Sequence, residues 1–329
     1  MKKILLHARH EDFKKLKPVL DDLYHIDVDE GDFVQVKIFT PDSEVNNIID
    51  KIREPLDLRY KENLIEVSTP DFVISSTLSR AEKFAPKHEK TPVELLLNSA
   101  KNYSSIDYWI LLLTTIAGLI ALTGLFLNNV AIIIGAMLLA PILGPIHSFA
   151  IYAATGRTKD ALMSVFALFI YLVAILFVSM IATYFLNLME VSIPETIYTL
   201  EITQEILLRT TTSPIYILMA IMLGLASMIA ISKGFSESIA GVAVAAALLP
   251  PTVVAGISVI MIPEATAGAI VLTLDNVIGL IAGALIGTLI IGVAPRTGPD
   301  ARVAKKFVNR TTVLIVLFIA VLTVISLAF

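Results

Sequence analysis

The sequence predicts an α-helical membrane protein with a small α/β domain at its N-terminus. Of its 329 residues, 56% are hydrophobic and only 16% are charged, whereas an average soluble domain has about 25% charged residues. Most of the charged residues lie in residues 1–105, and long apolar segments fill the rest of the chain. Two of these segments contain prolines at positions where a membrane-spanning helix is expected to be continuous.

The first 75 residues have the pattern of a ferredoxin-like domain, in the order strand, helix, strand, strand, helix, strand. The expected elements are residues 3–8, 12–23, 25–28, 33–39, 44–53 and 64–67. This pattern is common in dimerising and regulatory domains, so we expect a packing domain or one that binds a small effector. We expect residues 76–106 to form a helical linker at the membrane surface.

The remainder, residues 107–329, is predicted to be a transmembrane domain, because about 20 apolar residues cross a bilayer. The seven expected spans are residues 108–127, 128–153, 161–186, 214–231, 236–261, 265–293 and 312–329. Pro141 and Pro145 interrupt the second span, and Pro250 and Pro251 interrupt the fifth. Paired interruptions of this kind point to a transport site, because the freed backbone groups need partners in protein or water.

Spans one to three resemble spans four to six, which predicts two repeats, residues 107–187 and 212–293, and a final span at 312–329. Aligned at an offset of 110 residues, the broken segments share four pairs of residues: Ala136/Ala246, Leu138/Leu248, Leu139/Leu249 and Pro141/Pro251. Because each repeat has three spans, an odd number, the second repeat begins on the opposite face of the membrane from the first. Inverted repeats that meet at broken helices are typical of secondary transporters.

The distribution of charge predicts the orientation. Lys and Arg are concentrated in loops 154–160, 232–235 and 294–311, on the side of the N-terminal domain. The opposite side holds the acidic loop 187–213 and Glu264. Because basic loops stay in the cytoplasm, we expect a cytoplasmic N-terminus and a C-terminus outside.

The two proline motifs also suggest a family. Residues 135–145 read GAMLLAPILGP and residues 241–251 read GVAVAAALLPP. They resemble a prokaryotic membrane family known as domain of unknown function 389, over roughly residues 100–295, and the α/β head is similar to the one such proteins carry. The resemblance implies a multi-pass protein of the prokaryotic inner membrane. It supplies no catalytic residue and no substrate.

Candidate site residues surround the two predicted breaks: Pro141, Gly144, Pro145, His147, Ser148, Pro250, Pro251 and Thr252. Amides at the start of a half-helix attract anions, and exposed carbonyls attract cations. The alternative is a pair of kinks that serve only packing. His147 is suited to relaying a proton or binding an anion, or else it is satisfied by a carbonyl near the interface. We expect the hydroxyl group of Thr252 either to line the solute pathway or to donate a hydrogen bond to a backbone carbonyl that the prolines free.

Asp275 is the acid that lies well inside an apolar segment, where a charge costs several kcal/mol. With Asn276 it is suited to coordinating a cation or carrying a proton. Alternatively, the helix starts near Val277 and Asp275 caps it at the outer interface. Gly279, Gly283 and Gly287 recur every fourth residue, which predicts close helix packing or oligomerisation.

Several classes of function are disfavoured. The chain has no cysteine, which excludes disulfides, thiolate nucleophiles and Cys-type zinc sites. The histidines lack a metal-ligand spacing, so we expect neither a metal nor a cofactor. A net charge of −4 without a basic stripe argues against nucleic acid.

An intramembrane enzyme is also disfavoured. His147, Ser148 and Asp275 have suitable side chains, but no metalloprotease motif or nucleophile elbow is present. We therefore predict a homo-oligomeric transporter or channel for a small solute or ion in the lipid bilayer, and no enzyme. The alternative is a membrane-anchored sensor or scaffold whose cytoplasmic domain binds a small ligand.

Overall fold

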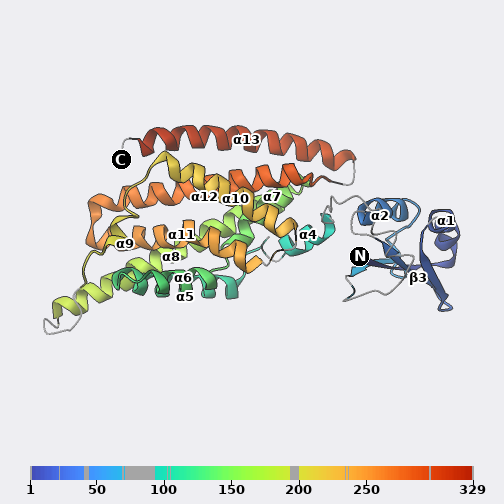
Figure 1. The fold of residues 1–329 in the computed structure, drawn as a ribbon, viewed down its shortest axis with the longest axis horizontal. Helices are drawn as coiled ribbons and strands as arrows, with labels where there is room; N and C mark the ends of the chain where they lie inside the picture. The colour runs from blue at the N-terminus through green and yellow to red at the C-terminus, as the bar shows by residue number, and fades with distance from the viewer. Residues whose placement is uncertain are drawn as a thin grey trace. The chain divides into compact units, whose positions relative to one another are not determined.

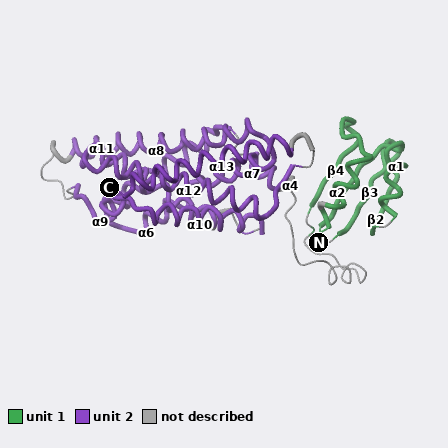
Figure 2. The backbone as a smooth tube through the Cα atoms, turned by 90° about the horizontal axis from the view of Figure 1, so that it is seen from above, with its two compact units in different colours: residues 1–92 green, residues 93–329 purple. Residues whose placement is uncertain are grey.

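The computed structural model divides the chain into two compact units, residues 1–92 and 93–329 (Figure 2). It describes residues 2–21, 23–40, 44–68, 70, 93–101, 103, 105–192, 200–233, 235, 237–295 and 298–327. Residues 76–92 of the predicted linker, 76–106, lie outside these ranges, and so do residues 71–75 of the predicted head.

In its described residues, the first unit is a four-stranded antiparallel sheet with two helices. Its elements are β1 (Lys2–Ala8), α1 (His10–Leu20), β2 (His25–Asp29), β3 (Val34–Thr40), α2 (Val45–Arg53) and β4 (Leu64–Ser68). Their order along the chain is the order that the sequence predicted. The strands are arranged β2-β3-β1-β4, with Ile4 opposite Ile38 on one side and Val67 on the other. Alternation along β1 buries Ile4, Leu6 and Ala8 in a core with α1 and α2.

The second unit is a bundle of apolar helices (Figure 1). Its elements are α4 (Val93–Lys101), α5 (Tyr108–Phe126), α6 (Val130–Leu139), α7 (Leu143–Ala154), α8 (Thr158–Ser192), α9 (Gln204–Leu207), α10 (Pro214–Ser232), α11 (Glu237–Met261), η2 (Pro263–Ala265), α12 (Thr266–Ile291) and α13 (Gly298–Ser326). Six of these helices are long and apolar enough to cross a membrane, and α6 with α7 makes a seventh if the bent pair is one span. The chain is thus a multi-pass membrane protein by length and composition.

The first predicted interruption is present. α6 ends at Leu139, α7 begins at Leu143, and the two helices are bent by 46°. Ala140 is extended, with φ −83° and ψ 109°, because the ring of the following proline, Pro141, disfavours the helical conformation at this residue. Every residue of α7 except Gly144 is buried, so this short helix lies inside the bundle.

The predicted interruption at Pro250 and Pro251 is wrong. α11 runs without a break from Glu237 to Met261 and contains both prolines. Pro251 leaves the carbonyl of Ala247 without its helical donor, and the side-chain amide of Asn276 on α12 donates to that oxygen at 2.7 Å. A neighbouring helix therefore supplies the missing hydrogen bond, the condition under which proline is tolerated inside a span.

Two further expectations need correction. The predicted loop 294–311 is helical from Gly298 onward, as the first half of α13. Asp275 lies within α12, nine residues after its start at Thr266. The alternative in which a helix begins near Val277 and Asp275 caps it is therefore wrong.

The glycines of α12 face α10 in the same chain. A methyl group added to Gly279 would lie 2.8 Å from the carbonyl oxygen of Ile217, and one at Gly287 would lie 2.9 Å from Cβ of Met228. At Gly283 it would overlap the carbonyl oxygen of Ile221. These glycines allow the two helices to approach closely, and the chain itself covers their face.

Candidate functional site

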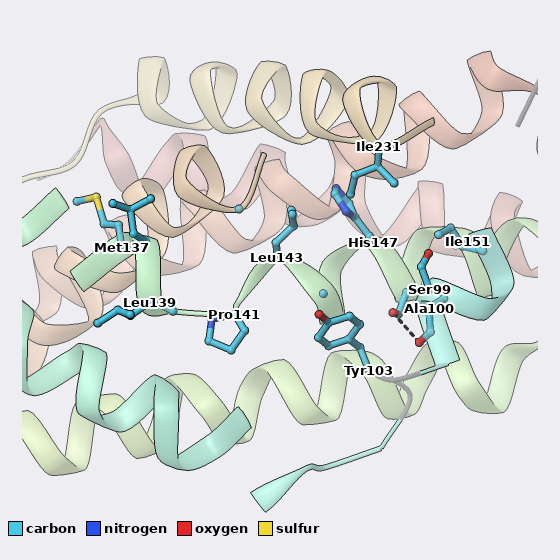
Figure 3. Close-up of a pocket in the computed structure, with 15 residues that line it drawn as sticks. Ser99, Ala100, Tyr103, Met137, Leu139, Pro141, Leu143, His147, Ile151 and Ile231 are labelled. Atoms are coloured by element: carbon cyan, nitrogen blue, oxygen red, sulfur yellow. Dashed lines mark hydrogen bonds between the residues drawn. The ribbon is translucent and has the colours of Figure 1, made fainter. Parts of the chain in front are cut away.

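A cavity of about 190 Å³ lies at the break between α6 and α7 (Figure 3). Four of the predicted site residues, Pro141, Gly144, His147 and Ser148, line it. The walls also include α4, the end of α10 and the start of α11. The other lining residues are Ser99, Ala100, Tyr103, Met137, Leu138, Leu139, Ala140, Leu143, Ile151, Ile231 and Gly241.

The two helix ends at the break line this cavity. The last carbonyls of α6 and the first amides of α7 have no partner within their own helices. Gly144 is in the first turn of α7, where amide groups carry a partial positive charge. Pro145, also in this turn, has no amide hydrogen to leave unpaired, and its ring is buried.

His147 is held by a hydrogen bond on α10. Its side chain is 5% exposed, and Nε2 lies 2.9 Å from Oγ of Ser227. The Ser227 hydroxyl donates its one proton to the carbonyl of Gly224, at 2.9 Å. Ser227 must therefore accept from Nε2–H of His147, which leaves Nδ1 of the neutral ring as an acceptor.

Ser148 and Tyr103 connect the cavity to the segment around α4. The buried hydroxyl of Ser148 donates to the carbonyl of Ala100, at 3.0 Å. The ring of Tyr103 contacts Gly144 so closely that a methyl group there would overlap it. α4 is thereby part of the cavity wall, and its Leu96 and Ala100 are buried in the core of the second unit.

Asp275 forms a separate polar cluster, and it does not line the cavity. The side chain is 0% exposed, and its Oδ2 accepts hydrogen bonds from Oγ1 of Thr212 and, at 2.8 Å, from Oγ of Ser326. Its Oδ1 has no hydrogen-bond partner among the described residues, and neither has Oδ1 of Asn276.

The residues of the second predicted break lie in the interior of α11, away from the cavity lining. Thr252 donates to the carbonyl of Leu248, four residues before it, at 2.7 Å. Pro250, Pro251 and Thr252 are all buried in the continuous helix. Thr252 therefore does not bond either carbonyl that the prolines release.

No nucleophile and base are brought together among the predicted residues. His147 bonds Ser227, Ser148 bonds a backbone carbonyl, and Asp275 bonds two hydroxyls elsewhere. In the described part of the chain, no group of three or more His, Asp or Glu residues is placed to hold a metal ion.

The hydroxyl partners of His147 and Asp275 were not predicted from the sequence. Ser227 and Ser326 are polar residues within apolar spans, and this would have singled them out. Thr212 precedes α10 in a run of three threonines, and Tyr103 follows α4. Neither of these two carries a distinctive signal in the sequence, because each role depends on a contact with a distant helix.

The comparisons with known proteins leave the activity of the chain open. Residues 137–282 match the family described as Domain of unknown function (DUF389). The chain is 26% identical over 298 residues to the Uncharacterized protein MJ0678 of Methanocaldococcus jannaschii, covering 90% of this chain and 88% of that protein. No solved structure matches the chain significantly. The matched segment contains the break, α11 and Asp275, so the resemblance seen in the two proline motifs is confirmed: residues 137–282 of the chain are similar to the DUF389 family.

Proposed function

We propose that the protein is a transporter or channel for a small solute or ion, and that the solute passes through the cavity between α6 and α7. The observation that carries the proposal is a cavity at an interrupted helix, inside an apolar bundle, which is lined by Leu139, Ala140 and Pro141 of the break. Irregular backbone at membrane depth is tolerated where it lines a cavity, and such breaks are used as binding sites in transporters.

The lining suits a small polar solute. About 190 Å³ is below the range of about 300–1,000 Å³ that is typical of pockets for drug-sized ligands. The described lining residues carry no fixed charge, and their polar groups are hydroxyls, one imidazole and backbone amides and carbonyls. Discrimination would then depend on hydrogen bonding and on size.

The arrangement of the helices supports the inverted repeat as part of the proposal. In each half, a plain helix is followed by a proline-containing element and then by a long helix. The proline-containing element of each half packs on the long helix of the other, α11 on α8 and α7 on α12. The symmetry is inexact, because the first proline element is broken and the second is continuous.

We also propose that the α4 end of the bundle faces the cytoplasm of a prokaryotic cell. This end carries exposed basic residues, Arg157, Lys159, Arg302, Lys305, Lys306 and Arg310. In both views it lies opposite the end that carries α9 and the last turn of α13 (Figures 1 and 2). The difference follows the rule that basic residues remain inside.

The head is the basis of a second candidate function, the sensing of a cytoplasmic ligand. Its element order, strand, helix, strand, strand, helix, strand, supports a ferredoxin-like domain as part of this proposal. The specific observation is that α4, which follows the head in the chain, is hydrogen-bonded to the cavity wall through Ala100 and Ser148. A ligand that moved α4 would change the cavity, which makes the head a regulator of transport.

Flux into proteoliposomes tests the main proposal, with sodium, potassium, chloride, phosphate, acetate and glycerol as probes. We expect at least one probe to enter with the parent protein and to enter more slowly with Pro141→Ala, because alanine allows the helix to continue across the break. Pro18→Ala, in α1 of the head, is the matched control and leaves flux unchanged. No flux of any probe with the parent protein would overturn the proposal.

A further inference from the structure

An uncompensated charge would be costly in the Asp275 cluster. The carboxyl group is fully buried, about 14 Å along α12 from its start at a rise of about 1.5 Å per residue. A buried carboxylate is stable only when it is paired with a cation or well hydrogen-bonded. No Lys, Arg or His in the described ranges forms an ion pair with it.

The two oxygens of the carboxyl group have unequal surroundings. Oδ2 accepts from the hydroxyls of Thr212 and Ser326, which are also within 3.4 Å of each other. Oδ1 has no hydrogen-bond partner among the described residues. In a protonated carboxyl group, one oxygen is a carbonyl oxygen that only accepts hydrogen bonds, and the other carries the proton. Oδ2, which accepts from two hydroxyls, is suited to the first role, and Oδ1 is therefore free to bind the proton.

None of the other ionisable groups in the described part of the elements around α12 forms a hydrogen bond to Asp275. His147 of α7 bonds Ser227, and Arg209 before α10 pairs with Glu205. Glu264 of η2 is exposed, and the basic residues of α13 lie between Arg302 and Arg310, at least 16 residues before Ser326. These elements also carry the hydroxyls of Tyr152 and Tyr216, the acids Asp300 and Glu237, and Lys233 at the end of α10.

We propose that Asp275, with Thr212 and Ser326, is a proton-binding site and that its proton is the coupling ion of the transporter. The role as coupling ion rests on the function proposed above, and proton binding itself does not. Protonation removes the buried charge and lets the last turn of α13 stay docked through Ser326. Loss of the proton leaves a charge that water or a movement of α10 and α13 must accommodate. α13 is the least buried of the six candidate spans, so it is the element most readily displaced.

Infrared spectroscopy of the full chain in lipid tests the site without any transport measurement. At neutral pH exposed carboxyl groups are ionised, so a band of a protonated carboxyl reports a buried acid. We expect this band in the parent and in Glu264→Gln, which removes an exposed acid, and its loss in Asp275→Asn. Absence of the band from the parent would overturn the assignment, and so would its disappearance when sodium is added at constant pH, because the site would then hold a metal cation.

A second variant keeps the test decisive if Asp275→Asn does not fold. Thr212→Val retains the carboxyl group and removes one donor to its Oδ2, so the band should move to higher frequency. An unchanged frequency would show that the band comes from another acid and would overturn the assignment. If a solute enters the proteoliposomes but the infrared band is absent, only the inference about Asp275 is overturned. If the band is present but no solute enters, only the function proposed above is overturned.

Discussion

The side-chain amide of Asn276 donates to the carbonyl oxygen of Ala247 at 2.7 Å, and Ala247 is the residue whose helical donor is removed by Pro251. One side chain on α12 thus replaces the backbone hydrogen bond that a proline removes from α11. Both groups are buried, at 2% exposure for Asn276 and 4% for Ala247, so water is not available as a substitute.

The first prediction follows from this hydrogen bond between Asn276 and Ala247. Asn276→Ala leaves a buried carbonyl without a donor and should lower the free energy of unfolding in detergent by about 1–3 kcal/mol. In the Pro251→Ala background the backbone amide of residue 251 supplies the bond, so Asn276→Ala should cost less there. A double-mutant cycle measures both losses of unfolding free energy. Equal losses in the two backgrounds would show that Asn276 does not replace the hydrogen bond that Pro251 removes.

The contact between α10 and α12 gives a second prediction. Gly283→Ala places a methyl group against the backbone of Ile221 and Leu225, so it should destabilise the protein by about 1–3 kcal/mol or more. Gly135→Ala in α6 is the matched control, because nothing lies within 4 Å of its added methyl group. The control should gain up to about 1 kcal/mol from helix propensity. Thermal unfolding in detergent measures both, and similar values for the two variants would count against close packing at Gly283.

A third prediction concerns Tyr103, whose ring closes over Gly144 at the cavity. Tyr103→Ala should enlarge the cavity and raise flux in proteoliposomes. Tyr184→Ala removes a ring that is 52% exposed on α8 and should leave flux as it is. If both substitutions change the flux by the same amount, the Tyr103 ring does not restrict the passage of the solute.

The head provides a prediction about pH. Hydrogen bonds from Asn63, first, and then from Arg9 and Lys15 hold the pKa of the buried Asp12 below its ordinary value. A depressed folded-state pKa adds stability at pH values above the unfolded-state pKa of about 3.9, and this contribution is lost as pH falls toward the folded-state pKa.

Asp12→Asn should therefore weaken the protection of β1 amides against hydrogen exchange in the full chain at neutral pH, and the difference from the parent should shrink below about pH 4. Asp27→Asn, at an exposed position of β2, is the control and should change little. A difference that persists undiminished into the acid range would show that Asp12 acts through packing alone.

Local signals in the sequence predicted the architecture well. Periodicity and the positions of turn residues gave the six elements of the head in order, and apolar length gave the spans. Pro141 was a reliable signal of a break because the residue before it is forced out of the helical conformation. These features depend on neighbours along the chain, which a single sequence contains.

The errors concern contacts between distant residues. Pro250 and Pro251 have the same local signal as Pro141, but the hydrogen bond from Asn276 to Ala247 comes from another helix and cannot be seen in the sequence around the prolines. In the same way, Asp275 was singled out by its chemistry, but its partners Thr212 and Ser326 are 63 and 51 residues away. A partner at such a separation is determined by how the helices pack and cannot be deduced from spacing.

The central claim, that the cavity at the break is a solute path, is tested most directly by cysteine labelling, since the chain has no cysteine of its own. Ser148 and Ser164 are both 0% exposed and both donate to a backbone carbonyl, but only Ser148 lines the cavity. A charged, water-soluble thiol reagent should label Ser148→Cys in membranes and block its flux, because thiols react as thiolates in contact with water. It should leave Ser164→Cys unlabelled and active. Failure to label Ser148→Cys, or labelling that leaves flux intact, would contradict the proposed path.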